Sequence, residues 1–110
     1  MQSLHIEKAI KELAKREQEL EELWDDFVEK EHAFECAYTA TFLKEEGSIE
    51  LRKELAKSAT FDLRLERDKA EAKLKLMQIK VKDCIQVISA RQSILSSETR
   101  VHGVSDRYTT

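Results

Sequence analysis

Apolar residues in the first half of this chain recur at alternating steps of four and three. Steps that average 3.5 residues keep one side of a helix facing a partner, as in left-handed coiled coils. Charged residues fill most of the positions between them, so the pattern predicts one continuous helix over residues 3–46. The ladder consists of Ile6, Ile10, Leu13, Glu17, Leu20, Trp24, Phe27, Glu31, Phe34, Tyr38 and Thr41.

Two of these inward positions are acidic. An unpaired buried carboxylate is costly, so we expect Glu17 and Glu31 to be solvated or paired with bases of a second helix.

The second half repeats the same spacing and predicts a helix over residues 49–100. Its ladder consists of Ala56, Thr60, Leu63, Arg67, Ala70, Leu74, Met77, Val81, Cys84, Ile88, Arg91 and Leu95. The stretch Leu76–Val81 also alternates as a strand would, but strong helix formers flank it and no second strand lies nearby.

Gly47 and Ser48 separate the two predicted helices. Glycine ends a helix in the left-handed conformation without steric penalty, and serine caps the start of the next helix. A connection this short folds the second helix back against the first. The predicted fold is therefore all-α, a long antiparallel two-helix hairpin, with the coiled-coil turn at residues 47–48. Its predicted intrachain core is Ile10, Leu13, Leu20, Trp24, Phe27, Phe34, Tyr38, Leu63, Leu74, Met77, Val81 and Ile88.

The apolar stripe widens over the second half of the second helix, beyond what one partner helix can cover. Because an isolated two-helix hairpin is marginally stable, we predict a homo-oligomer, a bundle of four or more helices. The predicted oligomer interface is Leu76, Ile79, Ile85, Val87 and Ile94.

The chain becomes polar after residue 96. Terminal residues are ordered only when other contacts hold them, so residues 101–110 are predicted to be a flexible C-terminal tail, with a short docking peptide as the alternative.

Composition supports long helices in an interaction protein. The 110 residues include no proline and two glycines, and 37% are charged. Residues 1–47 carry 13 acids and 6 bases, whereas residues 48–110 carry 9 acids and 13 bases, which suits two segments lying side by side. No signal peptide or membrane span is recognisable, so we expect a cytoplasmic protein with no membrane contact.

No constellation of residues predicts catalysis, a cofactor or a small-molecule substrate. Glu29 and His32 have the spacing of a di-iron half-site, and His32 with Cys36 that of a zinc half-site, but the remaining ligands are missing. We interpret Cys36 and Cys84 as reduced thiols, with a disulfide as the alternative. We therefore predict no metal site and no enzyme.

Basic residues gather in the first part of the second helix. They would suit phosphate contacts with nucleic acid, although no aromatic side chain lies among them for base stacking. The candidates are Arg64, Arg67, Lys69, Lys73, Lys75, Lys80 and Lys82. Acidic residues over 17–26 instead suggest contact with a basic partner protein, so a non-enzymatic interaction protein, a single-stranded DNA-binding accessory protein and an inhibitor of a host protein are the three functional hypotheses, in that order.

The stretch 37–56 combines an aromatic residue and leucine, Phe42-Leu43, with a Glu46-Gly47-Ser48 turn and then Arg52 on a charged helix. It resembles the centre of small helical-hairpin proteins of tailed bacteriophages. That resemblance covers roughly residues 34–95 and implies a viral accessory protein in the host cytoplasm, one that assists DNA recombination or annealing. It implies no catalytic residues.

Overall fold

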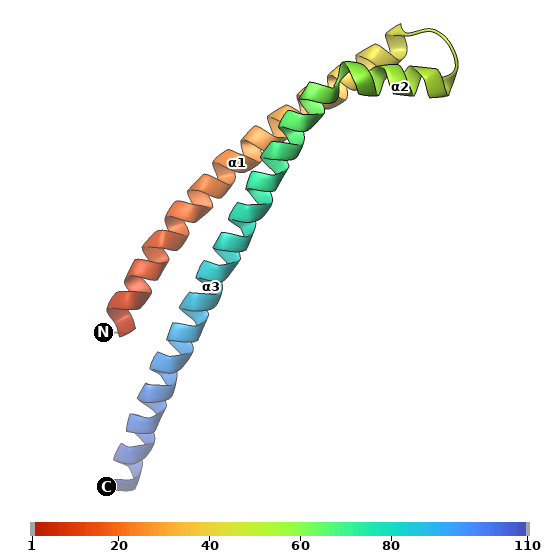
Figure 1. Ribbon diagram of the computed structural model, residues 1–110. Coiled ribbons are helices and arrows are strands. Elements are labelled where there is room, and N and C mark those ends of the chain that lie inside the picture. Colours follow the sequence, from red (N-terminus) through yellow and green to blue (C-terminus); the bar gives the residue numbers. More distant parts are fainter. Residues whose placement is uncertain (1, 110) are drawn as a thin grey trace. The chain divides into compact units, whose positions relative to one another are not determined.

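The computed structural model describes the backbone of residues 2–109 and the side chains of residues 4–97. Over these residues the chain forms three helices, α1 (Gln2–Lys44), α2 (Ile49–Ala59) and α3 (Phe61–Thr109) (Figure 1). No residue from 2 to 109 lies in a strand. The prediction of an all-α fold is confirmed, and the strand alternative within α3 is wrong.

Two compact units make up the chain. Unit 1 contains Met1–Glu19 and Met77–Thr110, and unit 2 contains Leu20–Leu76. Unit 1 therefore combines the start of α1 with most of α3, whereas unit 2 holds the rest of α1, all of α2 and the start of α3.

Gly47 and Ser48 shape the connection between α1 and α2. Gly47 has a φ of 111°, a value that side chains with a Cβ rarely adopt. A Cβ at this position would also lie 2.9 Å from Cδ2 of Leu51. Ser48 caps α2, because its hydroxyl oxygen accepts a hydrogen bond from the backbone N–H of Leu51 at 3.2 Å.

Arg52 ties α2 to the end of α1 within unit 2. Its Nε donates to the backbone oxygen of Phe42 at 3.0 Å, and its guanidinium lies 4.2 Å from the centroid of the Phe42 ring. The last carbonyls of a helix have no partner within the helix, so this hydrogen bond satisfies one of them. One turn later Ala56 is fully buried.

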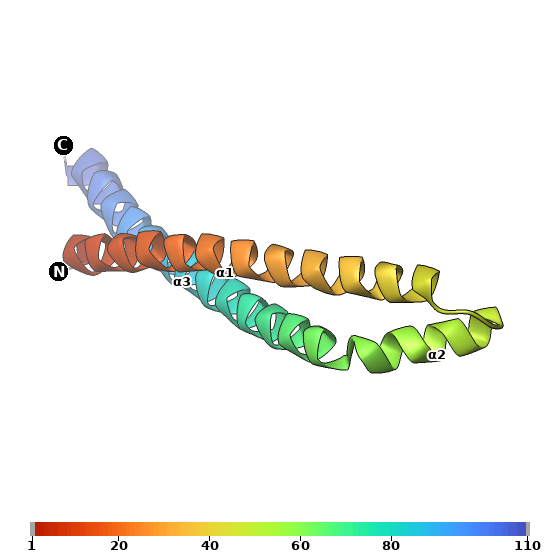
Figure 2. The ribbon, with the colours of Figure 1, turned by 90° about the horizontal axis from the view of Figure 1, so that it is seen from above.

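The helix predicted over residues 49–100 is interrupted at Thr60, where α2 ends and α3 begins (Figure 2). Thr60 is buried, and its hydroxyl donates to the backbone oxygen of Ala56 at 2.6 Å. The Thr60 N–H shares that acceptor at 3.1 Å, and the backbone leaves helical geometry with a φ of −110° and a ψ of 13°. A threonine that bonds back to the carbonyl four residues earlier bends a helix in this way.

The inward face after the break follows the expected spacing. Leu63 and Leu95 are the most exposed members of the ladder, at 38% each, so the placement of Leu63 in the intrachain core is wrong. The side chains of this face are buried at Thr60, Ala70, Leu74 and Ile88, and half-buried at Arg67, Met77, Val81, Cys84 and Arg91.

The inward face of α1 differs from the predicted one at alternate positions. Leu13, Leu20, Phe27, Phe34 and Tyr38 are half-buried, and Ile6 is buried. Ile10 and Trp24 are 48% and 51% exposed, so their placement in the intrachain core is wrong. Ala9, Arg16 and Leu23, each one position earlier in the sequence, are half-buried where Ile10, Glu17 and Trp24 are exposed. At the next such step Lys30 and Glu31 are both half-buried.

Electrostatics contributes to this choice of face at Glu17. The predicted ladder would turn Glu17 inward, whereas the observed one turns Arg16 inward and leaves Glu17 exposed; Glu31, the other predicted inward acid, is half-buried, as is Lys30. Long cationic side chains bury their methylene stems while their charged ends stay near water. Both charged groups form ion pairs with acids of α1. Arg16 lies 2.9 Å from Glu12, and Lys30 lies 2.9 Å from Asp26. The hydrogen bond to Asp26 raises the pKa of Lys30 above its ordinary value.

Helix α3 runs past its predicted end near residue 100 and continues to Thr109. The side chains of residues 98–110, and the backbone of residue 110, lie outside the described residues. The mobility predicted for residues 101–110 stays a prediction.

Candidate functional site

The residues predicted to form an oligomer interface are all about half exposed in the single chain. Leu76, in unit 2, is 54% exposed. The other four lie in unit 1, with Ile79 at 57%, Ile85 at 47%, Val87 at 45% and Ile94 at 48%. An aliphatic side chain left in water forgoes roughly 25 cal/mol for each Å² that burial would remove. These side chains are therefore the candidate contacts for a partner.

Within unit 1 the exposed aliphatic residues of α3 lie on two different sides of the helix. A rotation of about 100° per residue places Ile79, Val87 and Ile94 within about 80° of one another, on the side away from Val81. Ile85 lies on the flank of the inward face instead. We call Ile79, Asp83, Val87, Ala90 and Ile94 the outer face of α3. The five predicted interface residues therefore do not form one continuous surface.

A mostly apolar hollow of about 340 Å³ runs beside the outer face, where the start of α1 meets α3 in unit 1. Small side chains at Ala9 and Cys84 leave this space open, and Val87 lies at its edge. A neighbouring hollow of about 360 Å³ shares Ala9 and Val87 and extends to Arg91. The residues that line the first hollow are Ala9, Glu12, Arg16, Lys80, Asp83, Cys84 and Val87.

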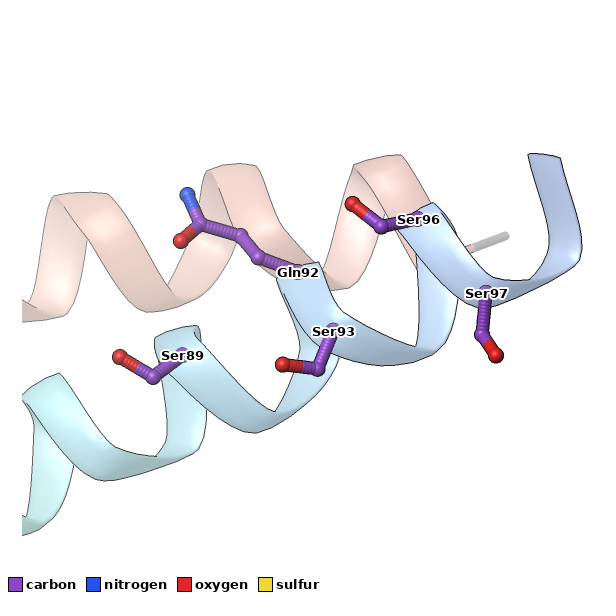
Figure 3. Close-up of a pocket in the computed structure, with 5 residues that line it drawn as sticks. All are labelled: Ser89, Gln92, Ser93, Ser96 and Ser97. Atoms are coloured by element: carbon purple, nitrogen blue, oxygen red, sulfur yellow. The ribbon is translucent and has the colours of Figure 1, made fainter. Parts of the chain in front are cut away.

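A polar hollow of about 400 Å³ lies further along α3, on successive turns of the helix (Figure 3). The sequence predicts helix over this stretch and gives no sign of the hollow. Hydroxyl and amide groups line it without any charged or metal-binding side chain: Ser89, Gln92, Ser93, Ser96 and Ser97.

The basic candidates for nucleic-acid contact do not share one face. In unit 2, Lys69 and Lys73 lie on one flank of the inward face and Lys75 on the other, by the rotation of the helix. In unit 1, Lys80 and Lys82 likewise fall on opposite flanks of Val81.

Four of these bases already have acidic neighbours on α3. Arg67 makes two interactions. Its guanidinium lies 4.8 Å from the centroid of the Phe34 ring and 2.9 Å from the carboxylate of Asp68. The other three pairs are Arg64 with Asp68 at 3.9 Å, Lys69 with Glu66 at 3.6 Å, and Lys75 with Glu71 at 2.8 Å. Lys73, Lys80 and Lys82 are exposed.

The acidic stretch of α1 is only partly available to a partner. Glu17, Glu21, Glu22 and Asp25 are exposed, whereas Glu19 is half-buried. Asp26 is half-buried and its carboxylate is occupied by Lys30.

The cysteines and histidines do not assemble a metal site in the part of the chain that the structure describes. Both Cys36 and Cys84 are free thiols. Sγ of Cys36 lies 3.5 Å from Nε2 of His32, on an exposed side of α1. No three His, Cys, Asp or Glu side chains among the described residues lie close enough together to hold a metal ion.

Comparison with protein-family models, with curated proteins and with solved structures finds no match to this chain. None of the helices, over the residues described, combines the length and the apolar character that crossing a bilayer requires.

Proposed function

We propose that this chain is a non-enzymatic helical interaction protein that works as an oligomer. In this proposal α1 pairs with α2 and α3 as a long antiparallel hairpin, and hairpins assemble into a bundle of four or more helices. Its biochemical role is to present helix faces to other protein chains.

The observation that carries the proposal is the imbalance between buried and exposed apolar side chains. Among residues 4–97 the buried apolar side chains are Ile6, Ala56, Ala70, Leu74 and Ile88. Large aliphatic and aromatic side chains remain exposed on all three helices. Single exposed apolar residues are ordinary, but a surface with so many of them is typical of proteins that bind other chains.

The resemblance of the turn region to small helical-hairpin proteins of tailed bacteriophages supports an accessory role for this module. Such a protein would act by contacting a component of a larger assembly in the host cytoplasm.

Light scattering across protein concentrations from about 1 to 100 μM tests the oligomer. We expect a mass at least twice that of the 12.8 kDa chain. A monomer over the whole range would contradict the proposal, because the exposed aliphatic residues would then have no partner.

Nucleic-acid binding is the second candidate, and the exposed Lys73, Lys80 and Lys82 favour it. A gel shift with single- and double-stranded DNA at low salt separates it from the first, since phosphate contacts are strongest there. Retarded DNA that is released as salt rises would favour a DNA-binding accessory protein.

Inhibition of a host protein through the acidic stretch of α1 remains the third candidate. Neutralising Glu17, Glu21, Glu22 and Asp25 should then change the set of host proteins that the chain captures. An unchanged set would eliminate this candidate.

A further inference from the structure

A histidine and a cysteine lie in contact on the exposed side of α1. His32 and Cys36 are four residues apart in unit 2, and both side chains are exposed. Sγ of Cys36 lies 3.5 Å from Nε2 of His32 and 3.9 Å from Nδ1, so Nε2 is the nearer ring nitrogen. Imidazole nitrogen and thiolate sulfur are the ligands of structural zinc sites.

The separation of these two atoms fits a single tetrahedral zinc ion. Zinc binds thiolate sulfur at about 2.3 Å and histidine nitrogen at about 2.0–2.1 Å, so the tetrahedral angle places two such ligands about 3.5 Å apart. The distance between Sγ of Cys36 and Nε2 of His32 is also 3.5 Å. One ion can therefore bind both atoms while they keep this separation.

A single chain supplies only two of the four ligands of a closed zinc site. No third His, Cys, Asp or Glu side chain among the described residues lies close enough to join the pair. The same pair from a second copy would complete a set of two cysteines and two histidines, which is a common composition of structural zinc sites. A two-fold axis through the metal produces this set, because both partners then use the same surface.

The surroundings of the pair are open and suit a cation. A hollow of about 520 Å³ follows this side of α1 from His32 to Leu43, and all the residues that line it belong to α1 and are exposed. Glu35 lines the hollow, and among the described residues no lysine or arginine does. Leu43, at its far end, is 69% exposed, the highest value among the large apolar side chains that the structure describes. This side of α1 is therefore accessible to a metal ion and to a second chain.

We propose that His32 and Cys36 of two copies bind one zinc ion between their α1 helices. Binding releases the proton of each Cys36 thiol to water, and each His32 binds through an unprotonated Nε2. The inference goes beyond the proposed oligomer, since the exposed aliphatic residues of α3 take no part in this site.

Titration of the reduced, metal-free, full-length chain with Co²⁺ tests the ligands. Tetrahedral Co²⁺ with thiolate ligands gives visible absorption and a thiolate-to-metal charge-transfer band, and added Zn²⁺ should abolish both because zinc binds such sites more tightly. We expect saturation at one metal ion for two chains. Cys36→Ser and His32→Ala should each weaken binding at least about tenfold, since losing a hydrogen-bond partner of a ligand alone costs that much.

Cys84→Ser is the matched control. It removes the other free thiol, which has Lys80 rather than a histidine four residues before it. Its affinity for Co²⁺ should equal that of the wild type, and circular dichroism should show the same helix content in every variant.

X-ray absorption spectroscopy of the zinc-loaded chain tests the contribution of the second copy. We expect two sulfur and two nitrogen neighbours around each zinc ion. One sulfur and one nitrogen neighbour, with oxygen in the remaining positions, would mean that one chain binds the ion alone and would overturn the shared site.

Light scattering in the presence of EDTA separates this inference from the proposed function. A chain that associates in EDTA but shows no thiolate-to-cobalt band retains the proposed oligomer and overturns the zinc site. A chain that is monomeric in EDTA and pairs when zinc is added supports the zinc site and contradicts the metal-free oligomer. Equal weakening of metal binding by Cys84→Ser and Cys36→Ser would also overturn the zinc site.

Discussion

At the scale of single residues, a few side chains with unusual backbone or hydrogen-bonding properties determine where each helix begins and ends. Gly47 adopts a φ of 111°, and Ser48 caps α2 with its hydroxyl oxygen. Both roles follow from the chemistry of one residue and its immediate neighbours, so the sequence indicates them directly. Thr60 has the same local character, but threonine inside a helical ladder is common, and its effect on the backbone was not predicted.

Replacing Gly47 with alanine should destabilise the chain. The positive φ strains any residue with a Cβ, and the added carbon would lie 2.9 Å from Leu51. We expect the free energy of unfolding to fall by about 1–3 kcal/mol. Urea denaturation followed by circular dichroism, at one protein concentration, measures it. Ser58→Ala, at an exposed position of α2, should change it by less than about 0.5 kcal/mol. Equal effects of the two substitutions would refute the role of the glycine.

At the scale of elements, two of the most deeply buried side chains are small ones. Ala56 in α2 and Ala70 in α3 are almost fully buried, at 0% and 2% exposed. The spacing of the sequence predicts both on the inward face, because steps of four and three residues return to the same side of a helix whatever the size of the side chains. The spacing does not reveal that these positions, rather than the larger Leu63, are the most tightly packed.

Enlarging Ala56 should therefore cost more than enlarging an exposed alanine of the same helix. Ala56→Leu forces additional methyl groups into a filled contact and should lower the free energy of unfolding by about 1–3 kcal/mol. Ala59→Leu makes the same change where the side chain is exposed, so it should leave stability nearly unaltered. Thermal unfolding of both variants by calorimetry is the measurement. A stabilised Ala56→Leu chain would mean that this contact has room to spare.

At the scale of the whole molecule, the chain leaves much of its apolar surface uncovered, and association would couple folding to concentration. Anything that binds the folded chain and not the unfolded one raises its apparent stability by mass action. The outer face of α3 is the part of unit 1 where three half-exposed aliphatic side chains share one side of a helix.

The melting temperature should accordingly rise with protein concentration. We expect a measurable increase between about 5 and 500 μM for the wild type, because dilution favours the separated chains. Val87→Asp places a charge among the exposed aliphatic side chains of the outer face, so its melting temperature should vary less with concentration. Lys82→Asp should retain the concentration dependence. Identical behaviour of wild type and Val87→Asp would argue against this face.

The sequence by itself determined the helical class, the turn at Gly47 and Ser48, and most of the inward face of α3. These features depend on local conformational preference and on the 3.5-residue repeat, both of which can be read without a partner. The excess of apolar residues over 76–94 was also visible, since it requires only counting positions around a helix.

Only the tertiary structure decided which flank of α1 turns inward. Two ladders share Leu13, Leu20, Phe27 and Phe34, and they differ by one residue at every other step. An ideal helix has 3.6 residues per turn, so both ladders lie close to the same side and periodicity cannot separate them. The choice depends on which side chains can be partly buried at low cost. Arg16 extends its charge to an acid near the surface, whereas an inward Glu17 would lose its hydration. At the next step Lys30 and Glu31 are both half-buried, so only the step at 16 and 17 separates the two ladders by charge.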